Sequence, residues 1–130
     1  MTREELKARV LDFTDAFNRE DLDRVMVYMA DKALYDEFDG HRAEGLAAIQ
    51  EAFAPQFSGQ FGEMRFLEED IILDAESRSA MISWTCAMKT AEHYGGWRGL
   101  DLLFFNEDGQ IVRKETYAKA KKPLMRRLEQ

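Results

Sequence analysis

The hydrophobic periodicity of the chain changes near residue 60, and this change limits the folds that the chain can adopt. Before that point, Leu6, Val10 and Phe13 recur every three or four residues, as on one face of an amphipathic helix. After it, runs such as residues 80–94 are rich in β-branched and aromatic residues, which indicates strands. Helices followed by consecutive strands are typical of an α+β domain with an antiparallel sheet.

Three helices are expected in the first part of the chain. Thr2 is placed to cap the first helix, with Glu5 three residues later as in a capping box. Asp21 can cap a second, short helix. A third helix is expected over residues 42–53, with Pro55 just past its end, where proline is tolerated.

The strands are expected to form one curved sheet. Tight turns separate the segments, and the expected strands cover residues 33–38, 64–74, 80–94, 97–105 and 111–118. The Gly95–Gly96 pair is predicted to be a two-residue hairpin turn, which would set Thr90 opposite Asp101. About three helices would then cover one face of the sheet, and the space inside this cone would form a ligand pocket.

Length and charge exclude several classes of protein. The 130 residues can bury one core, so a single domain over residues 1–130 is expected. With 18 Lys and Arg against 25 Asp and Glu, the net charge of −7 argues against nucleic acid as a partner. No apolar run approaches the roughly 20 residues of a membrane helix, and the charged N-terminus lacks the apolar core of a signal peptide. We therefore expect a cytoplasmic protein without a membrane partner.

The sequence contains no motif for a metal or a cofactor. It lacks metal-ligand spacings and phosphate-binding glycine loops, so neither a metal nor a cofactor is expected. Its single cysteine, Cys86, lies in an apolar run and is expected to be a small buried residue.

Asp101 is the most informative polar residue, because it stands alone between Leu100 and Leu102 in an apolar strand. If helices cover its face of the sheet, the carboxyl group would be desolvated and neutral, and could donate a hydrogen bond to a ligand. The alternative is a carboxylate at the rim of the sheet, paired with Arg98, Arg113 or Lys114.

A second carboxylate near the end of the first expected strand could complete an acid/base pair with Asp101. Strict alternation would place Tyr35 and Glu37 on one face of that strand. Asp36 and Asp39 remain alternatives to Glu37, because a shift of one residue changes the face. His41, just after the Asp39–Gly40 turn, is expected at the surface or at a helix cap.

The face that carries Asp101 also carries candidate pocket walls. Alternation along the two long strands assigns to it Trp84, Met88, Thr90 and Trp97. These side chains would form an apolar wall for a flat ligand, or else simply pack in the core. The opposite face is expected to carry Leu100, Leu102 and Phe104.

Four segments in this order carry a family resemblance: residues 17–23, 29–33, 43–49 and 99–111. Together they resemble the nuclear transport factor 2-like superfamily, in its SnoaL-like and ketosteroid-isomerase-like branch. The resemblance spans nearly the whole chain and implies a cone-shaped α+β barrel, also called cystatin-like. It further implies a homodimer formed through the outer face of the sheet.

The resemblance also implies roles for individual residues. Asp101 falls where ketosteroid isomerases have a donor acid, and Glu37 falls where they have the base. Phe13 stands at the position of their tyrosine donor, and Thr116 at that of the catalytic aspartate of polyketide cyclases. The expected function is a cofactor-independent isomerase, cyclase or lyase acting on a small apolar carbonyl compound. The alternative is a non-catalytic module for small-molecule binding or dimeric assembly.

Overall fold

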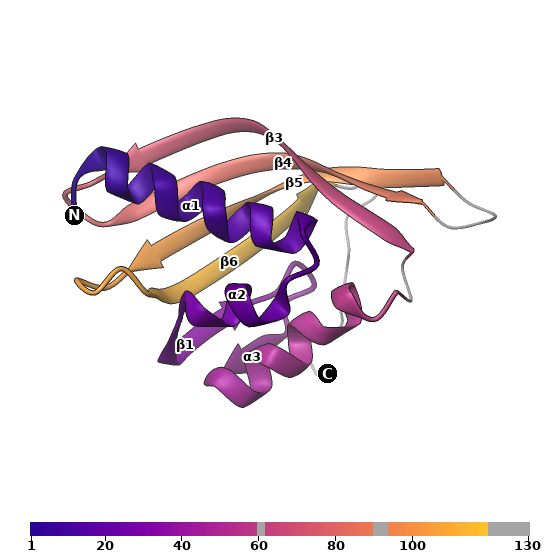
Figure 1. Cartoon of the computed structure of the whole chain (residues 1–130), viewed down its shortest axis with the longest axis horizontal. Helices are drawn as coiled ribbons and strands as arrows, with labels where there is room; N and C mark the ends of the chain where they lie inside the picture. Colours follow the sequence, from indigo (N-terminus) through magenta and orange to yellow (C-terminus); the bar gives the residue numbers. More distant parts are fainter. Residues whose placement is uncertain (60–61, 90–93, 120–130) are drawn as a thin grey trace.

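The computed structural model describes residues 1–59, 62–89 and 94–119, and it shows a curved sheet with helices on one side (Figure 1). The helical elements are α1 (Arg3–Asn18), α2 (Leu22–Val27), α3 (Leu46–Phe53) and the 3-10 helix η1 (Ala54–Phe57). The strands are β1 (Met29–Asp36), β2 (Arg42–Glu44), β3 (Glu63–Asp74), β4 (Ser79–Lys89), β5 (Tyr94–Phe105) and β6 (Ile111–Lys119).

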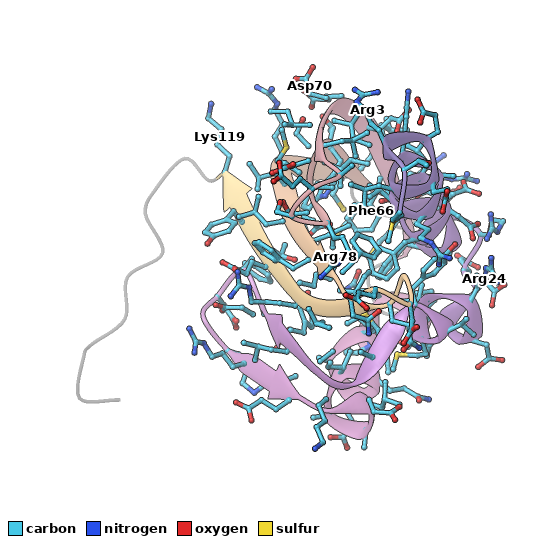
Figure 2. All side chains as sticks on the ribbon, turned by 90° about the vertical axis from the view of Figure 1, so that its left-hand side faces the viewer. Arg3, Arg24, Phe66, Asp70, Arg78 and Lys119 are labelled. Atoms are coloured by element: carbon cyan, nitrogen blue, oxygen red, sulfur yellow. The ribbon has the colours of Figure 1, made fainter. Side chains whose placement is uncertain are left out.

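All six strands belong to one sheet, in the order β2-β1-β6-β5-β4-β3. Only the β1–β6 pair is parallel, and the other neighbours are antiparallel. Helix α1 crosses the long strands, whereas α2 and α3 lie beside β1 (Figure 1). Figure 2 shows Phe66 inside the molecule and Asp70, on the same strand, at its surface. The expected α+β class, with a curved sheet covered by helices, is confirmed.

The first two helices begin where the capping residues predict. The Thr2 hydroxyl accepts the backbone N–H of Glu5 at 3.1 Å. The Asp21 carboxylate accepts the backbone N–H of Arg24 at 3.0 Å. These bonds satisfy N–H groups that have no partner within the helix.

The third helix begins later than expected. Residues 42–44 form strand β2, which pairs with the end of β1 through Tyr35 and Ala43. The Asp39–Gly40 turn makes this pair a hairpin, so the segment continues as a strand and buries Ala43. Gly45, with a φ of 85°, then redirects the chain into α3.

The two long strands pair in a different register from the one that the sequence predicts. Lys89 pairs with Tyr94, Met88 pairs with Gly95, and Asp101 lies opposite Ile82. The predicted Gly95–Gly96 turn is therefore wrong, as is the pairing of Asp101 with Thr90, which lies outside the described residues. A Cβ atom on Gly96 would stand 2.0 Å from the Cys86 carbonyl oxygen, so this glycine permits close strand contact instead of a turn.

The faces of these strands are nevertheless as predicted. The shift in pairing is an even number of residues, and side-chain direction repeats every two residues. Trp84, Asp101 and Leu103 are all buried on the inner face, and Cys86 is fully buried as expected. Within the described part of the chain, no helix is long and apolar enough to cross a membrane.

Candidate functional site

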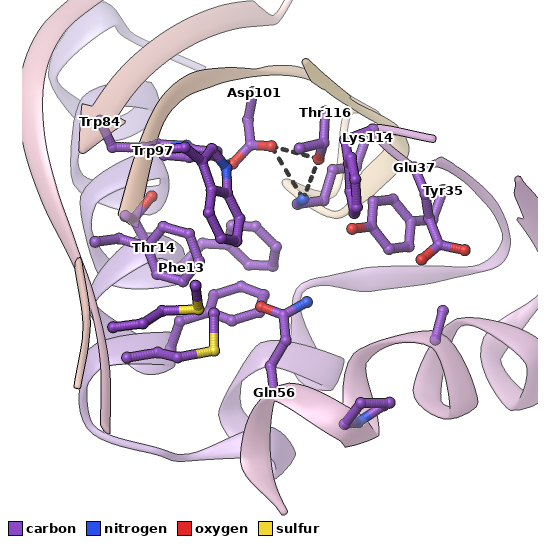
Figure 3. A pocket seen from close by; sticks show the side chains of 17 residues that line it. Phe13, Thr14, Tyr35, Glu37, Gln56, Trp84, Trp97, Asp101, Lys114 and Thr116 are labelled. Carbon is purple, nitrogen blue, oxygen red and sulfur yellow. Dashed lines mark hydrogen bonds and ion pairs between the residues drawn. The ribbon is translucent and has the colours of Figure 1, made fainter. Parts of the chain in front are cut away.

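A cavity of about 470 Å³ lies between the sheet and the helices (Figure 3). Its wall is mainly aromatic and thioether side chains, contributed by Phe13, Phe66, Trp84, Trp97, Met64 and Met88. This volume is in the range of sites for drug-sized molecules. An apolar wall of this kind favours a ligand with a flat, largely apolar body.

One end of the cavity is polar and is centred on Asp101, which is only 7% exposed. The indole N–H of Trp84 donates to its Oδ2 at 3.1 Å. Its Oδ1 accepts the Lys114 ammonium at 3.0 Å and the Thr116 hydroxyl at 2.6 Å (Figure 3). Trp84 and Lys114 can only donate, so these are the contacts of an accepting carboxylate. This differs from the neutral donor that the sequence suggested, and the partner is one of the three cations named as alternatives.

Lys114 is as buried as its partner, with 4% of its surface exposed. Burial disfavours the ammonium, but the Asp101 carboxylate and Tyr35 outweigh it and hold the pKa of Lys114 above its ordinary value. Its Nζ lies 4.4 Å from the ring centroid of Tyr35 and 5.6 Å from that of Phe53. The charge is therefore stabilised by a carboxylate and by aromatic faces inside the protein.

A β-bulge turns Lys114 toward the cavity. In the β5–β6 ladder Phe104 pairs with Arg113 but Phe105 pairs with Ile111, so Val112 is an extra residue. Strict alternation from the buried Ile111 would have sent Arg113 inward; the bulge puts Lys114 there instead. Thr116 follows on the same face, in agreement with its assignment to the site by the family resemblance. The alternation of apolar residues gave no signal for the bulge itself.

Two further polar groups of the cavity, Tyr35 and Glu37, come from the end of β1 and the residue just after it. Tyr35 is 3% exposed, its hydroxyl points toward Lys114, and burial raises the pKa of that hydroxyl (Figure 3). Glu37 lines the cavity, and its carboxylate contacts His41 Nδ1. Asp36 instead pairs with Arg42 at 3.6 Å, outside the set of residues that line the cavity.

Asp39, the other alternative to Glu37, accepts the backbone N–H of His41 at 3.0 Å within the turn. It does not line the cavity either. Of the three candidate carboxylates, the structure therefore places Glu37 at the cavity. His41 is exposed as expected, but it lies next to Glu37 and caps no helix.

Most sequence-predicted site residues come together at this cavity. The lining includes Asp101, Glu37, Phe13, Trp84, Met88, Trp97 and Thr116, while Thr90 lies outside the described residues. Lys114 and Gln56 were not predicted to line it. Gln56 points into the cavity from η1 (Figure 3), a short segment after Pro55 where hydrophobic periodicity gives no guidance.

The described residues contain no cluster of three or more His, Cys, Asp or Glu side chains placed to hold a metal ion.

The class of the protein follows from the fold together with a family match. A family model described as the SnoaL-like domain matches residues 10–114, most of the 130-residue chain. The chain therefore belongs to the SnoaL-like domain family. A comparison with curated proteins gives no match.

Solved structures share the fold at low sequence identity. A protein of unknown function with a cystatin-like fold, from Methylobium petroleophilum PM1, has a TM-score of 0.77 and 16% identity over 95% of this chain and 81% of its own. A putative polyketide cyclase from Xanthomonas campestris pv. campestris has a TM-score of 0.73 and 20% identity over 90% and 92% of the two chains.

SalBIII, described as an epoxide hydrolase/cyclase-like enzyme in pyran ring formation of the polyether salinomycin, is also similar. Its TM-score is 0.77, with 16% identity over 89% of this chain and 92% of its own. At these identities the three structures show a common fold and leave the function to be argued from the site.

Proposed function

We propose that the cavity binds a small, mainly apolar carbonyl compound and removes a proton from the carbon next to its carbonyl group. The reaction would be a cofactor-independent isomerisation, cyclisation or elimination. The observation that carries this proposal is the buried Lys114–Asp101 pair at the end of an aromatic cavity.

The placement of that pair supports a functional role. Replacing a buried ion pair by well-packed apolar residues is often neutral or stabilising, so such pairs are poor evidence of a stability device. This pair faces a cavity instead of a filled core. Polar groups that converge in an apolar pocket are characteristic of ligand sites.

The donor for a carbonyl oxygen would be Tyr35, beside Lys114. An ammonium has three N–H groups, and Lys114 gives two of them to Asp101 and Thr116. The third interacts with the Tyr35 hydroxyl, which can in turn donate its own hydrogen. The Tyr35 hydroxyl, backed by the Lys114 charge, is the proposed partner of an oxygen that becomes negative as the proton leaves. Asp101 would then hold Lys114 in place, a different role from the neutral donor suggested by the sequence.

Glu37 is the proposed base. Its side chain is 19% exposed and lines the cavity from just past the end of β1, two residues after Tyr35. An ionised carboxylate in this position could accept a proton from a ligand whose carbonyl oxygen is held at the Lys114 end.

The test uses β-tetralone, a bicyclic ketone with exchangeable protons beside its carbonyl, in heavy water. NMR should show deuterium entering the ketone faster with the protein than in buffer. Glu37→Gln should lower the rate by about a hundredfold or more, and Tyr35→Phe should also lower it. Glu44→Gln, on the exposed strand β2, is the matched control and should keep the full rate. A Glu37→Gln rate equal to that of the wild type would remove Glu37 as the base.

A second candidate function is non-catalytic binding in the same cavity. It is favoured by the state of Asp101, whose two oxygens already have three donors from the protein itself. The chain has two tryptophans, and both line the cavity, so their fluorescence reports binding. Quenching by β-tetralone without any exchange would support binding and contradict catalysis.

We also propose a homodimer formed through the outer face of the sheet. Leu67, Ile72 and Tyr117 are each more than half exposed on that face. The apolar residues Leu100 and Leu102 lie between them on β5 and are partly exposed. Sedimentation should give twice the chain mass, and Leu67→Glu should shift it toward the monomer; a wild-type monomer would contradict the proposal. A cytoplasmic location stays a prediction.

A further inference from the structure

The turn at the mouth of the cavity brings His41 back to Glu37. The Glu37 N–H donates to the His41 carbonyl at 2.8 Å, and the Gly40 N–H donates to the Glu37 carbonyl at 2.9 Å. Gly40 has a φ of 87°, in the left-handed region that favours glycine. This tight connection between β1 and β2 fixes the backbones of Glu37 and His41 relative to each other.

The two side chains also meet, and they connect the cavity with solvent. His41 Nδ1 contacts the Glu37 Oε2 atom. The Glu37 side chain is 19% exposed and lines the cavity, whereas that of His41 is 62% exposed. The imidazole therefore stands on the solvent side of the carboxylate.

Glu37 is the acid whose carboxylate contacts the His41 imidazole, and the neighbouring charged side chains make other contacts. The Asp39 carboxylate accepts the backbone N–H of His41, and the Arg42 guanidinium pairs with Asp36. In the part of the chain that the structure describes, the salt bridge of His41 is with Glu37.

We propose that His41 is a positioning residue for the Glu37 carboxylate, and that protonation of His41 weakens Glu37 as a base. The proposal rests on the role of Glu37 in the proposed function. A neutral imidazole with its hydrogen on Nδ1 donates to Oε2 and leaves Oε1 to face a ligand, because an ionised carboxylate can only accept. When the imidazole gains a second proton on Nε2, its positive charge stabilises the carboxylate form of Glu37 and lowers its tendency to take a proton.

The contact itself can be tested without any substrate. Nitrogen-15 NMR of neutral His41 should show the hydrogen on Nδ1 in the wild-type protein. Glu37→Ala should shift the hydrogen toward Nε2, while the signal of the second histidine, His93, serves for comparison. An Nε2-protonated ring in the wild-type protein would overturn the proposal.

The effect on Glu37 is tested by the β-tetralone exchange rate as a function of pH. His41→Leu should lower the rate by about tenfold to a hundredfold with little change in KM, as expected for a misplaced reacting group. His41→Asn should restore most of the rate, because its amide can donate to Glu37 without titrating. The fall of the rate toward acid pH should be less steep in His41→Asn than in the wild type.

The outcomes separate this inference from the proposed function. A His41→Leu rate and pH profile equal to those of the wild type, with Glu37→Gln inactive, would leave Glu37 as the base and overturn the role of His41. Absence of exchange in the wild type would overturn the proposed function and the catalytic part of this inference. The position of the hydrogen on the His41 ring, read from nitrogen-15 NMR, would then be the test of whether His41 donates to the Glu37 carboxylate.

Discussion

Two carboxylates, Asp12 and Asp101, accept hydrogen bonds from a similar number of side chains but lie in different surroundings. The Asp12 side chain is 29% exposed on α1, and its partners are Tyr28, Arg24 and Arg19. The Asp101 side chain is 10% exposed and lies at the polar end of the cavity. A carboxylate with three side-chain hydrogen-bond donors thus occurs once at the surface and once inside the protein.

The surface cluster, formed by Asp12, Arg19, Arg24 and Tyr28, has a structural role in joining two helices. It links α1 to α2, with the Arg24 Nη2 atom 2.7 Å from Asp12 Oδ2. The hydrogen bond from Tyr28 and the contacts with Arg24 lower the pKa of Asp12 to about 2. Two guanidinium groups, those of Arg19 and Arg24, pair with this one carboxylate, and both side chains remain exposed to water.

A role in stability does not explain the buried pair of Lys114 and Asp101. One ammonium offsets one carboxylate, and both have been removed from water at a cost of several kcal/mol per ion. The comparison teaches that multiple hydrogen bonds to a carboxylate do not by themselves identify a functional residue. Burial at the wall of a cavity distinguishes Asp101 from Asp12.

The largest difference should appear when each carboxylate loses a cation. Lys114→Met leaves Asp101 charged and buried, and should lower the free energy of unfolding by about 3–5 kcal/mol. Arg24→Met at the surface cluster should cost much less, because water screens the charges of that exposed pair. Urea unfolding of both variants measures this difference.

A double variant sharpens this first prediction. Lys114→Met combined with Asp101→Leu removes both charges and should return the free energy of unfolding close to that of the wild type. If Lys114→Met alone costs no more than Arg24→Met, the distinction between the two clusters is wrong.

Acid should weaken the surface cluster. Because the folded pKa of Asp12 is about 2, below its ordinary value of 3.8, its stabilisation is fully present above pH 3.8 and is lost as the pH falls toward 2. The loss should be at most about 2 kcal/mol, since partial exposure reduces it. The Asp12→Asn variant should have a lower free energy of unfolding at neutral pH, and that free energy should fall less between pH 3.8 and pH 2 than in the wild type. Parallel curves of unfolding free energy against pH for the two proteins would contradict the role of Asp12.

The smallest effect is expected at Arg19. Its side chain is 45% exposed, and it contacts both Asp12 and Asp15. Arg19→Ala should change the free energy of unfolding by less than Arg24→Met does, and added salt should reduce even that difference. A cost above that of Asp12→Asn would show that the surface cluster depends on Arg19 more than its exposure suggests.

Local signals in the sequence predicted the parts of the fold that depend on neighbouring residues. The caps at Thr2 and Asp21 act within three residues, so they could be identified without tertiary information. The faces of β4 and β5 were also predictable, because alternation survives any even shift in pairing.

Features that depend on contacts between distant segments were missed. Gly95–Gly96 suggested a turn, but Gly96 serves a close contact with Cys86 on the neighbouring strand. The bulge that turns Lys114 inward arises only in the pairing of β6 with β5. The Glu37–His41 contact needed the β1–β2 hairpin, in a segment where the sequence suggested the start of a helix.

The central claim is that the buried pair and Tyr35 recognise a carbonyl oxygen. The direct measurement is the carbonyl carbon-13 chemical shift of labelled β-tetralone bound to the protein, compared with the free ketone. The account predicts a downfield shift in the wild type, and a smaller one both in Tyr35→Phe and in the Lys114→Met, Asp101→Leu double variant. Equal shifts in all three proteins, with tryptophan quenching showing the ketone bound in each, would contradict it.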